Sequence, residues 1–316
     1  MFSGLKPLMI AIPLIGFVMP ATRGVAKEYS SVIEQERRVE RGSRIVVRNE
    51  FGDIRIEGSD RNTVEAVATD LNSSQPVPVR ITEASSASKK VFTVSPVESG
   101  RGDRQKINIL LEVKVPRDVE LERIYIRVGN ISVSDLDGGV SLRTDDGNIS
   151  VHRLGSPGGG LIDLATWSGN VDLSNINGDV RIVAISSGIT VRCVKGDVAA
   201  RVSSGEIAVS NIDGDVELNV SSGSASFTGP IHPERRYRLK TLSGNVSMDI
   251  PDSVGFTAVL TSYSGQLHTD FQFPSRSKQR IIGKYGDGTG RIELDSFNGS
   301  VQLRKIVASN SSDCPR

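Results

Sequence analysis

Hydrophobic and polar residues alternate in short runs through the middle of the chain, and the runs recur about every 18 residues. In residues 203–223, SSGEIAVSNIDGDVELNVSSG, the same Ser-Ser-Gly stands at both ends. Six apolar residues lie between the two copies: Ile207, Val209, Ile212, Val216, Leu218 and Val220. A period of two places such side chains on one face of a strand. Each repeat therefore predicts two short strands and one layer of core.

Related units run from about Gly129 to Leu303, and we expect them to stack in sequence order. Dipeptides such as Asn177-Gly178 and Asp213-Gly214 separate the strands and suit the positive φ of a tight corner. The final unit has these expected core positions: Ile292, Leu294, Phe297, Val301 and Leu303.

A repeat of about 18 residues with two strands indicates a chain that winds in coils, an all-β parallel β-solenoid. Each strand then pairs in parallel with its counterpart one coil away. Three hexapeptides would also give this length, but they would place an apolar residue at every sixth position. Ile207, Val209 and Ile212 fall in different phases of such a repeat, so the two-strand coil fits better.

The chain divides into four segments: a signal peptide over 1–26, a β-rich N-terminal cap with initial coils over 27–128, the regular solenoid over 129–305 and a polar tail over 306–316. In the cap, residues 44–56 predict two strands about a corner at Phe51-Gly52-Asp53, whereas residues 83–90 are loop-like in their serines. The cap would cover strand edges that otherwise invite aggregation.

The first residues are typical of an export signal. Lys6 precedes an apolar stretch from Pro7 to Met19, and the small residues after it suit cleavage after Ala26. The apolar stretch is shorter than the roughly 20 residues that a membrane-spanning helix needs. We therefore expect an exported protein.

Composition and charge narrow the function classes. The 316 residues include 32 glycines and 5% aromatic residues, and the formal net charge is +1 with both signs interspersed. Because no basic stripe is present, nucleic acid is not an expected partner. Cys193 and Cys314 are too few for a disulfide framework. Since one lies in the repeat and the other in the polar tail, we expect no bridge between them.

Asp179, Asp197 and Asp215 hold equal positions in successive units and should form a ladder. Like charges about 5 Å apart repel by roughly 1 kcal/mol in water, so a partner must offset the repulsion. That partner is either a backbone N–H group in the same turn or a bridging calcium ion. The glycine-rich spacing of calcium-binding β-rolls is absent, and we expect no metal and no other cofactor.

Catalytic motifs are also absent from the sequence. Its three histidines share no metal-ligand spacing: His152, His232 and His268. A polysaccharide hydrolase or lyase would need two carboxyl groups beside a cleft, and the middle coils leave little chain to build one. We expect a protein without enzymatic activity.

One outward residue between the apolar positions of each unit is small in most coils. This candidate docking face comprises Ser132, Ser150, Asp172, Thr190, Ala208, Ser226 and Ser247. Stacked, they would form a flat strip that a partner, or a second copy of the chain, could approach closely. The same residue types also suit an ordinary exposed strand. Polar insertions give a second, basic candidate surface near Arg235, Arg236, Arg276 and Lys278.

Four segments of the sequence resemble the bacterial putative adhesin family, a domain of unknown function built from Gly-Asn/Asp-Val/Ile repeats. They are IVVRNEFGDIRIEG, VKVPRDVELERIYIRVGNISV, LSGNVSMDIP and GTGRIELDSFNGSVQLRK, and the resemblance covers about residues 40–305. It implies the solenoid fold and a binding role at the bacterial surface. Some similar proteins are associated with envelope stress responses.

The expected function is therefore that of an exported, adhesin-like binding or scaffold protein in the periplasm, at the cell surface or in the medium. Its partner would be an envelope polymer or protein, and the chain could also self-associate along the flat strip. An envelope-stress sensor that binds a protein partner is the alternative. A polysaccharide-active β-helix enzyme is the third possibility.

Overall fold

The computed structural model describes residues 35–86, 89–97, 108–155, 160–306 and 314. The expected signal peptide, 1–26, lies outside these residues, as does most of the expected tail, 306–316. The described residues form 24 strands and no helix, which confirms the all-β class. Accordingly, no described segment is a helix long and apolar enough to cross a membrane.

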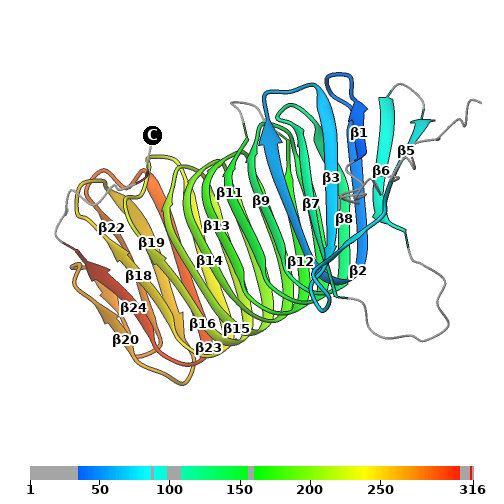
Figure 1. The fold of residues 1–316 in the computed structure, drawn as a ribbon. Helices are drawn as coiled ribbons and strands as arrows, with labels where there is room; N and C mark the ends of the chain where they lie inside the picture. Colours follow the sequence, from blue (N-terminus) through cyan, green and yellow to red (C-terminus); the bar gives the residue numbers. More distant parts are fainter. Residues whose placement is uncertain (1–34, 87–88, 98–107, 156–159, 307–313, 315–316) are drawn as a thin grey trace, which may run out of the picture. The chain divides into compact units, whose positions relative to one another are not determined.

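The strands stack side by side in two facing rows, and the chain crosses from one row to the other at each corner (Figure 1). We call them row A and row B. Four long strands turn a corner and contribute to both rows: β2 (Arg44–Ser59), β14 (Val180–Lys195), β15 (Val198–Ile212) and β16 (Val216–Thr228). Pairing between successive coils is parallel, as expected for the predicted solenoid.

Row A also contains ten shorter strands. In spatial order with the long ones, it reads β5 (Val79–Ser86), β6 (Lys89–Pro96), β2, β8 (Glu120–Val128), β10 (Val140–Asp146), β12 (Ile162–Ser168), β14, β15, β16, β17 (Arg236–Ser243), β23 (Gly290–Asn298), β19 (Phe256–Ser262), β22 (Arg280–Tyr285) and β21 (Ser275–Arg276).

Row B begins with β1 (Gln35–Arg38) and β4 (Gln75–Val77), which both pair with β3 (Thr63–Asp70). It continues through β7 (Ile109–Pro116), β2, β9 (Ile131–Leu136), β11 (Ile149–Leu154), β13 (Val171–Asn177), β14, β15, β16, β18 (Val246–Ile250), β24 (Val301–Lys305) and β20 (Leu267–Thr269).

Antiparallel pairs occur only toward the two ends of the described stack. β3 pairs in this way with β1, β4 and β7, and β5 with β6, near the N-terminal end; β22 pairs in this way with β19 and β21 near the other end. The β5–β6 hairpin corrects the expectation of a loop over residues 83–90. β5 is the outermost strand of row A at this end, where a strand needs only one apolar face.

Sequence order and spatial order differ at the C-terminal end. The last coil in the sequence consists of β23 and β24. In the stack, it lies between the coil of β17 and β18 on one side and the strands β19 and β20 on the other. The sequence analysis expected stacking in chain order. The difference arises because the segment between β20 and β23 folds back as the antiparallel strands β21 and β22, which occupy the outer edge.

The core consists of the inward-facing residues of both rows. All six apolar residues of the 203–223 unit are at most 4% exposed, which confirms their predicted core position. Phe297 was predicted to join them, but its side chain is 56% exposed. The reason is its phase: in β23, Ile292, Leu294 and Ser296 point inward, so Phe297 points out.

Asparagine side chains link successive coils at the corner between row A and row B. The backbone N–H of Asn130 donates to Asp53 Oδ1 at 2.9 Å, and that of Asn148 donates to Asn130 Oδ1 at 3.0 Å. Asn170 and Gly188 continue the ladder by donating to the side-chain oxygens of Asn148 and Asn170. The predicted corner at Phe51-Gly52-Asp53 thus begins a ladder of side-chain oxygens that satisfies backbone donors at the turns.

Glycine at this corner has a steric cause. A Cβ on Gly205 would lie 1.9 Å from the carbonyl oxygen of Ser187, and one on Gly223 would lie 1.8 Å from that of Gly205. Both glycines also have positive φ, 142° and 132°. The repeated Ser-Ser-Gly is therefore the same corner one coil later, where the backbone of the preceding coil leaves no room for a side chain.

We predict that Gly205→Ala lowers the free energy of unfolding by about 2 to 5 kcal/mol, because the added methyl group must displace backbone. Gly42→Ala is the matched control, since Gly42 also has positive φ (68°) but has no atom within 4 Å of an added Cβ. It should lose only about 1 to 2 kcal/mol. Denaturant unfolding measures both values, and equal losses would contradict the steric explanation.

Cys193 and Cys314 form a disulfide, contrary to the sequence-based expectation; their Cα atoms are 5.5 Å apart. Cys193 occupies a corner position of row B that recurs in neighbouring coils with φ between 52° and 62°, at Asp135, Arg153, Asn175 and Asn211. Side chains here face away from the core, and Cys193 is partly exposed. A residue of the repeat can therefore be reached by the C-terminal segment.

Reduction of this disulfide should destabilise the protein. The bridge spans 121 residues, and the loop-entropy model gives up to about 5 kcal/mol for a loop of this size. Dithiothreitol should lower the Tm of the native chain to that of Cys193→Ser and leave the variant unchanged. A Tm that is equally insensitive to dithiothreitol in both proteins would show that the bridge contributes no stability.

Candidate binding surface

The three aspartates of the predicted ladder lie at the corner that leads from row B into row A. The backbone N–H of Asp197 donates to Asp179 Oδ1, and that of Asp215 donates to Asp197 Oδ1, both at 2.9 Å. Arg236 extends the series by donating its N–H to Asp215 Oδ1. The carboxylates are thus held by the next coil, rather than by the same turn as the sequence analysis considered.

In the described part of the chain, no group of three His, Cys, Asp or Glu residues lies close enough together to hold a metal ion. His152 contacts Ser174 on row B, and His268 contacts Asp270 near β20. His232 lies 3.9 Å from Asp213. The three histidines therefore have different neighbours and do not share one site. The aspartate ladder therefore has a structural explanation in its backbone hydrogen bonds.

We predict that Asp197→Asn keeps the stability of the protein, because an amide oxygen accepts the Asp215 N–H equally well, as Asn148 does at the other corner. Asp197→Ala should lose about 1 kcal/mol, because that donor loses its partner. Neither calcium nor EDTA should change the Tm of the native chain. Stabilisation by calcium that disappears in Asp197→Asn would instead establish a metal site.

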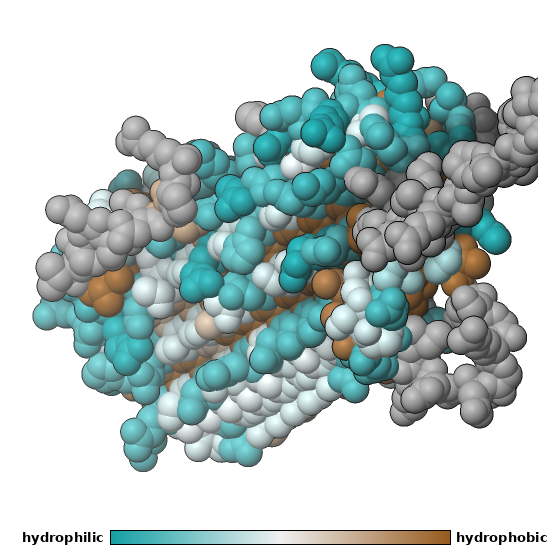
Figure 2. Space-filling view, in the orientation of Figure 1, coloured by the Kyte–Doolittle hydropathy of each residue, from teal (hydrophilic) through white to brown (hydrophobic). Residues whose placement is uncertain are grey.

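The candidate docking face lies on the outside of row B, and the strand register places its seven residues side by side. Ser150 pairs with Ser132 and Asp172, Thr190 with Asp172 and Ala208, and Ser226 with Ala208 and Ser247. Residues of similar hydropathy form bands that run across the strands in Figure 2. The strip exists as a structural feature, whereas its binding role stays a prediction.

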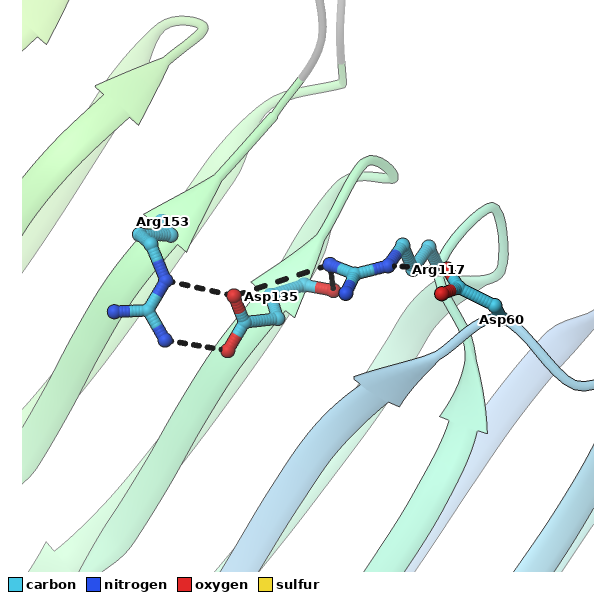
Figure 3. A network of polar contacts seen from close by, with 4 residues as sticks. All are labelled: Asp60, Arg117, Asp135 and Arg153. Atoms are coloured by element: carbon cyan, nitrogen blue, oxygen red, sulfur yellow. Dashed lines mark hydrogen bonds and ion pairs between the residues drawn. The ribbon is translucent and has the colours of Figure 1, made fainter. Parts of the chain in front are cut away.

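Several arginines on the outside of row B and at its corners are held by carboxylates. Arg153 donates two hydrogen bonds to Asp135, at 2.6 and 2.7 Å, and Arg117 joins Asp135 to Asp60 (Figure 3). The hydrogen bond from Arg153 lowers the pKa of Asp135. Arg192 pairs with Asp172 and Arg304 with Asp249 in the same way. The residues of the predicted basic surface do not form one patch. Arg235 lies 3.9 Å from Asp197, whereas Arg276 belongs to β21 at the far edge of row A.

The outside of row A differs, because it exposes large apolar side chains. Each is an outward-facing residue near the end of a row A strand, shortly before the chain reaches the asparagine corner. They are Trp167 (56% exposed), Val183 (48%), Ile185 (49%), Leu242 (60%), Phe297 (56%) and Tyr263 (64%). The register aligns Trp167 with Ile185 and aligns Leu242, Phe297 and Tyr263 with one another. The rings of Phe297 and Tyr263 stack with centroids 5.1 Å apart.

A groove of about 460 Å³ lies beside Leu242, Tyr263 and Phe297. Polar side chains from neighbouring strands form the rest of its wall, including Arg201, Asn219, Lys240 and Asp295. Lys240 is held by Glu293 at 2.8 Å and by Asp295 at 3.0 Å, and these carboxylates raise its pKa. The groove thus joins an aromatic surface to fixed polar groups.

A second groove, of about 600 Å³, lies on the same face beside Trp167. Arg123, Arg143, Asp163 and Tyr125 line it. The hydroxyl of Tyr125 donates to Asp145 at 2.9 Å, and this hydrogen bond raises the pKa of Tyr125. Both grooves therefore combine an exposed aromatic wall with hydrogen-bonding groups.

Five carboxyl groups have a lowered pKa, whereas a glycosidase acid needs a raised one: Glu65, Asp135, Asp252, Asp270 and Glu293. Burial opposes the shift at Glu293, but Lys240 and Arg238 outweigh it. These carboxylates act as ion-pair partners.

The sequence analysis missed the apolar face of row A, although the sequence contains a signal for it. A large apolar residue stands two positions before a corner glycine in Trp167-Ser168-Gly169, Leu242-Ser243-Gly244, Tyr263-Ser264-Gly265 and Phe297-Asn298-Gly299. In each case it follows an inward-facing residue, so the alternation of the strand directs it outward. Its recurrence in several coils would have predicted an exposed apolar column.

Comparison with solved structures found chains that are similar at low identity. A putative adhesin from Bacteroides fragilis is 12% identical over 87% of this chain and 96% of that chain, with a TM-score of 0.39. A putative cell adhesion protein from Clostridium sporogenes is 11% identical over 86% and 99%, with a TM-score of 0.22. A putative adhesin from Parabacteroides distasonis is 13% identical over 86% and 96%, with a TM-score of 0.23.

A comparison with curated proteins found no match. The family model described as Toastrack DUF4097 matches residues 42–304, which include the strands from β2 to nearly the end of β24. This range contains three of the four sequence segments that suggested the resemblance to a repeat family of unknown function, and all of the fourth except its last residue, Lys305. The chain belongs to the Toastrack DUF4097 family.

Proposed function

We propose that the protein is an exported, non-catalytic, adhesin-like protein that binds a component of the bacterial cell envelope on the outer face of row A. The observation that carries the proposal is the column of exposed apolar residues beside two grooves. Clustered exposed apolar side chains on a water-soluble surface mark interaction sites. Trp167, Phe297 and Tyr263 belong to the residue types that dominate binding energy.

The disulfide between Cys193 and Cys314 supports the exported location. Disulfides persist in oxidising compartments such as the periplasm and the cell surface, whereas the cytosol keeps thiols reduced. The expected signal peptide over 1–26 agrees with this location. Row B, with its flat strip of small residues, is the second candidate face for the same role.

Sedimentation with isolated cell envelopes tests the proposal. The native chain should co-sediment, whereas Trp167→Ala combined with Tyr263→Ala should reduce the bound fraction by at least about tenfold, since each aromatic contact contributes about 1 kcal/mol. Both side chains are exposed, so the variant should keep its Tm.

Two controls make the test specific. Leu71→Ala removes an exposed apolar side chain outside row A and should bind like the native chain. Ala208→Arg disrupts the flat strip of row B and should also bind normally. Binding that is lost in Ala208→Arg but kept in the aromatic variant would assign the function to row B. Failure of the native chain to co-sediment would refute the proposed function itself.

A further inference from the structure

We propose that the outer face of row A binds an uncharged linear polysaccharide that lies along the stack, across the strands. This inference rests on the proposed function and specifies its ligand class. The site consists of the two grooves and the central strip between them, which we define as the outward residues of β12, β14, β15 and β16.

The two aromatic walls and the strip between them form one continuous surface. Trp167 in β12 and Leu242 in β17 are four strand spacings apart, which corresponds to about 19 Å. Ile185 and Val183 extend the apolar surface from Trp167 toward the middle, and Phe297 and Tyr263 extend it beyond Leu242. A long, narrow ligand therefore meets apolar side chains at both ends, whereas a small ligand would use only one groove.

The polar groups of the central strip are balanced in charge. Arg181 lies beside Asp163 in the register, and Arg201 lies between Val183 and Asn219, whose amide donates to Glu217 at 3.0 Å. Arg181 and Arg201 make no ion pair or hydrogen bond with the described residues, in contrast to the paired arginines of row B. Free guanidinium groups donate hydrogen bonds, and the free carboxylate of Asp163 accepts them.

Sugar rings complement this combination of groups. A pyranose presents C–H groups that pack on an aromatic ring, and hydroxyl groups at its rim that both donate and accept hydrogen bonds. The aromatic side chains would hold ring faces, Arg181 and Arg201 would donate to hydroxyl oxygens, and Asp163 would accept from hydroxyl hydrogens. A polyanion or an anionic lipid surface fits less well, because Asp145, Asp163 and Glu217 offset the positive charges of the arginines on this face, Arg123, Arg143, Arg181 and Arg201.

Affinity electrophoresis of the native chain tests this ligand class. Gels would contain a soluble β-glucan, a mannan or a xylan, and a further gel would contain alginate as a polyanion. At least one neutral polysaccharide should retard the protein. Trp167→Ala and Phe297→Ala should each weaken the apparent Kd by about tenfold, and Leu71→Ala should leave it unchanged. Salt between 50 and 500 mM should change the Kd less than twofold.

The remaining outcomes overturn the inference. No retardation by any neutral polysaccharide, retardation by alginate alone, or equal retardation of native and aromatic variants would each reject it. If the protein still co-sediments with envelopes in such a case, the proposed function stands and its ligand is a protein, a polyanion or a lipid. If co-sedimentation also fails, the proposed function fails with it.

Discussion

Each coil of this protein places its corner backbone directly on that of the preceding coil, and the rest of the structure depends on this contact. At Gly205 and Gly223 the approach leaves no space for a Cβ atom. The same proximity lets a side-chain oxygen at one corner accept the backbone N–H of the next, as Asn130 and Asp179 do. Parallel strands can then pair in register in both rows, and their inward side chains form a continuous core.

The stacking contact constrains the inward positions and the corners, but it leaves the outward positions free to vary. Row B uses them for ion pairs between coils, such as that of Arg153 with Asp135. Row A also contains ion pairs between strands, such as that of Lys240 with Glu293, but it exposes large apolar side chains as well, among them Trp167, Leu242 and Phe297. These exposed apolar side chains are unfavourable in water and add little to the stability of the fold. Their concentration on one face is the basis of the binding site proposed above.

The period of two and the glycine spacing were sufficient to predict the fold class and the buried residues of the middle coils. They depend on local alternation, which the sequence displays directly. The bridge between Cys193 and Cys314 could not be predicted, because it depends on where the C-terminal segment lies in space. Phe297 was assigned to the core from its hydrophobicity, although its phase in the strand directs it outward. The apolar face of row A could have been found from the residues before the corner glycines, since the same phase argument applies to each.

The insertion of the last coil between two earlier ones makes the order of assembly differ from the order of synthesis. β19 has β23 as its parallel neighbour, so its place in the stack is complete only after residues 290–298 have emerged. Until then, the coil of β17 and β18 presents open strand edges on its C-terminal side. A chain that emerges from its N-terminus can build the middle coils one by one, but it must wait for its final strands before it can close. A truncated product would therefore retain an exposed edge, which distinguishes incomplete chains from complete ones.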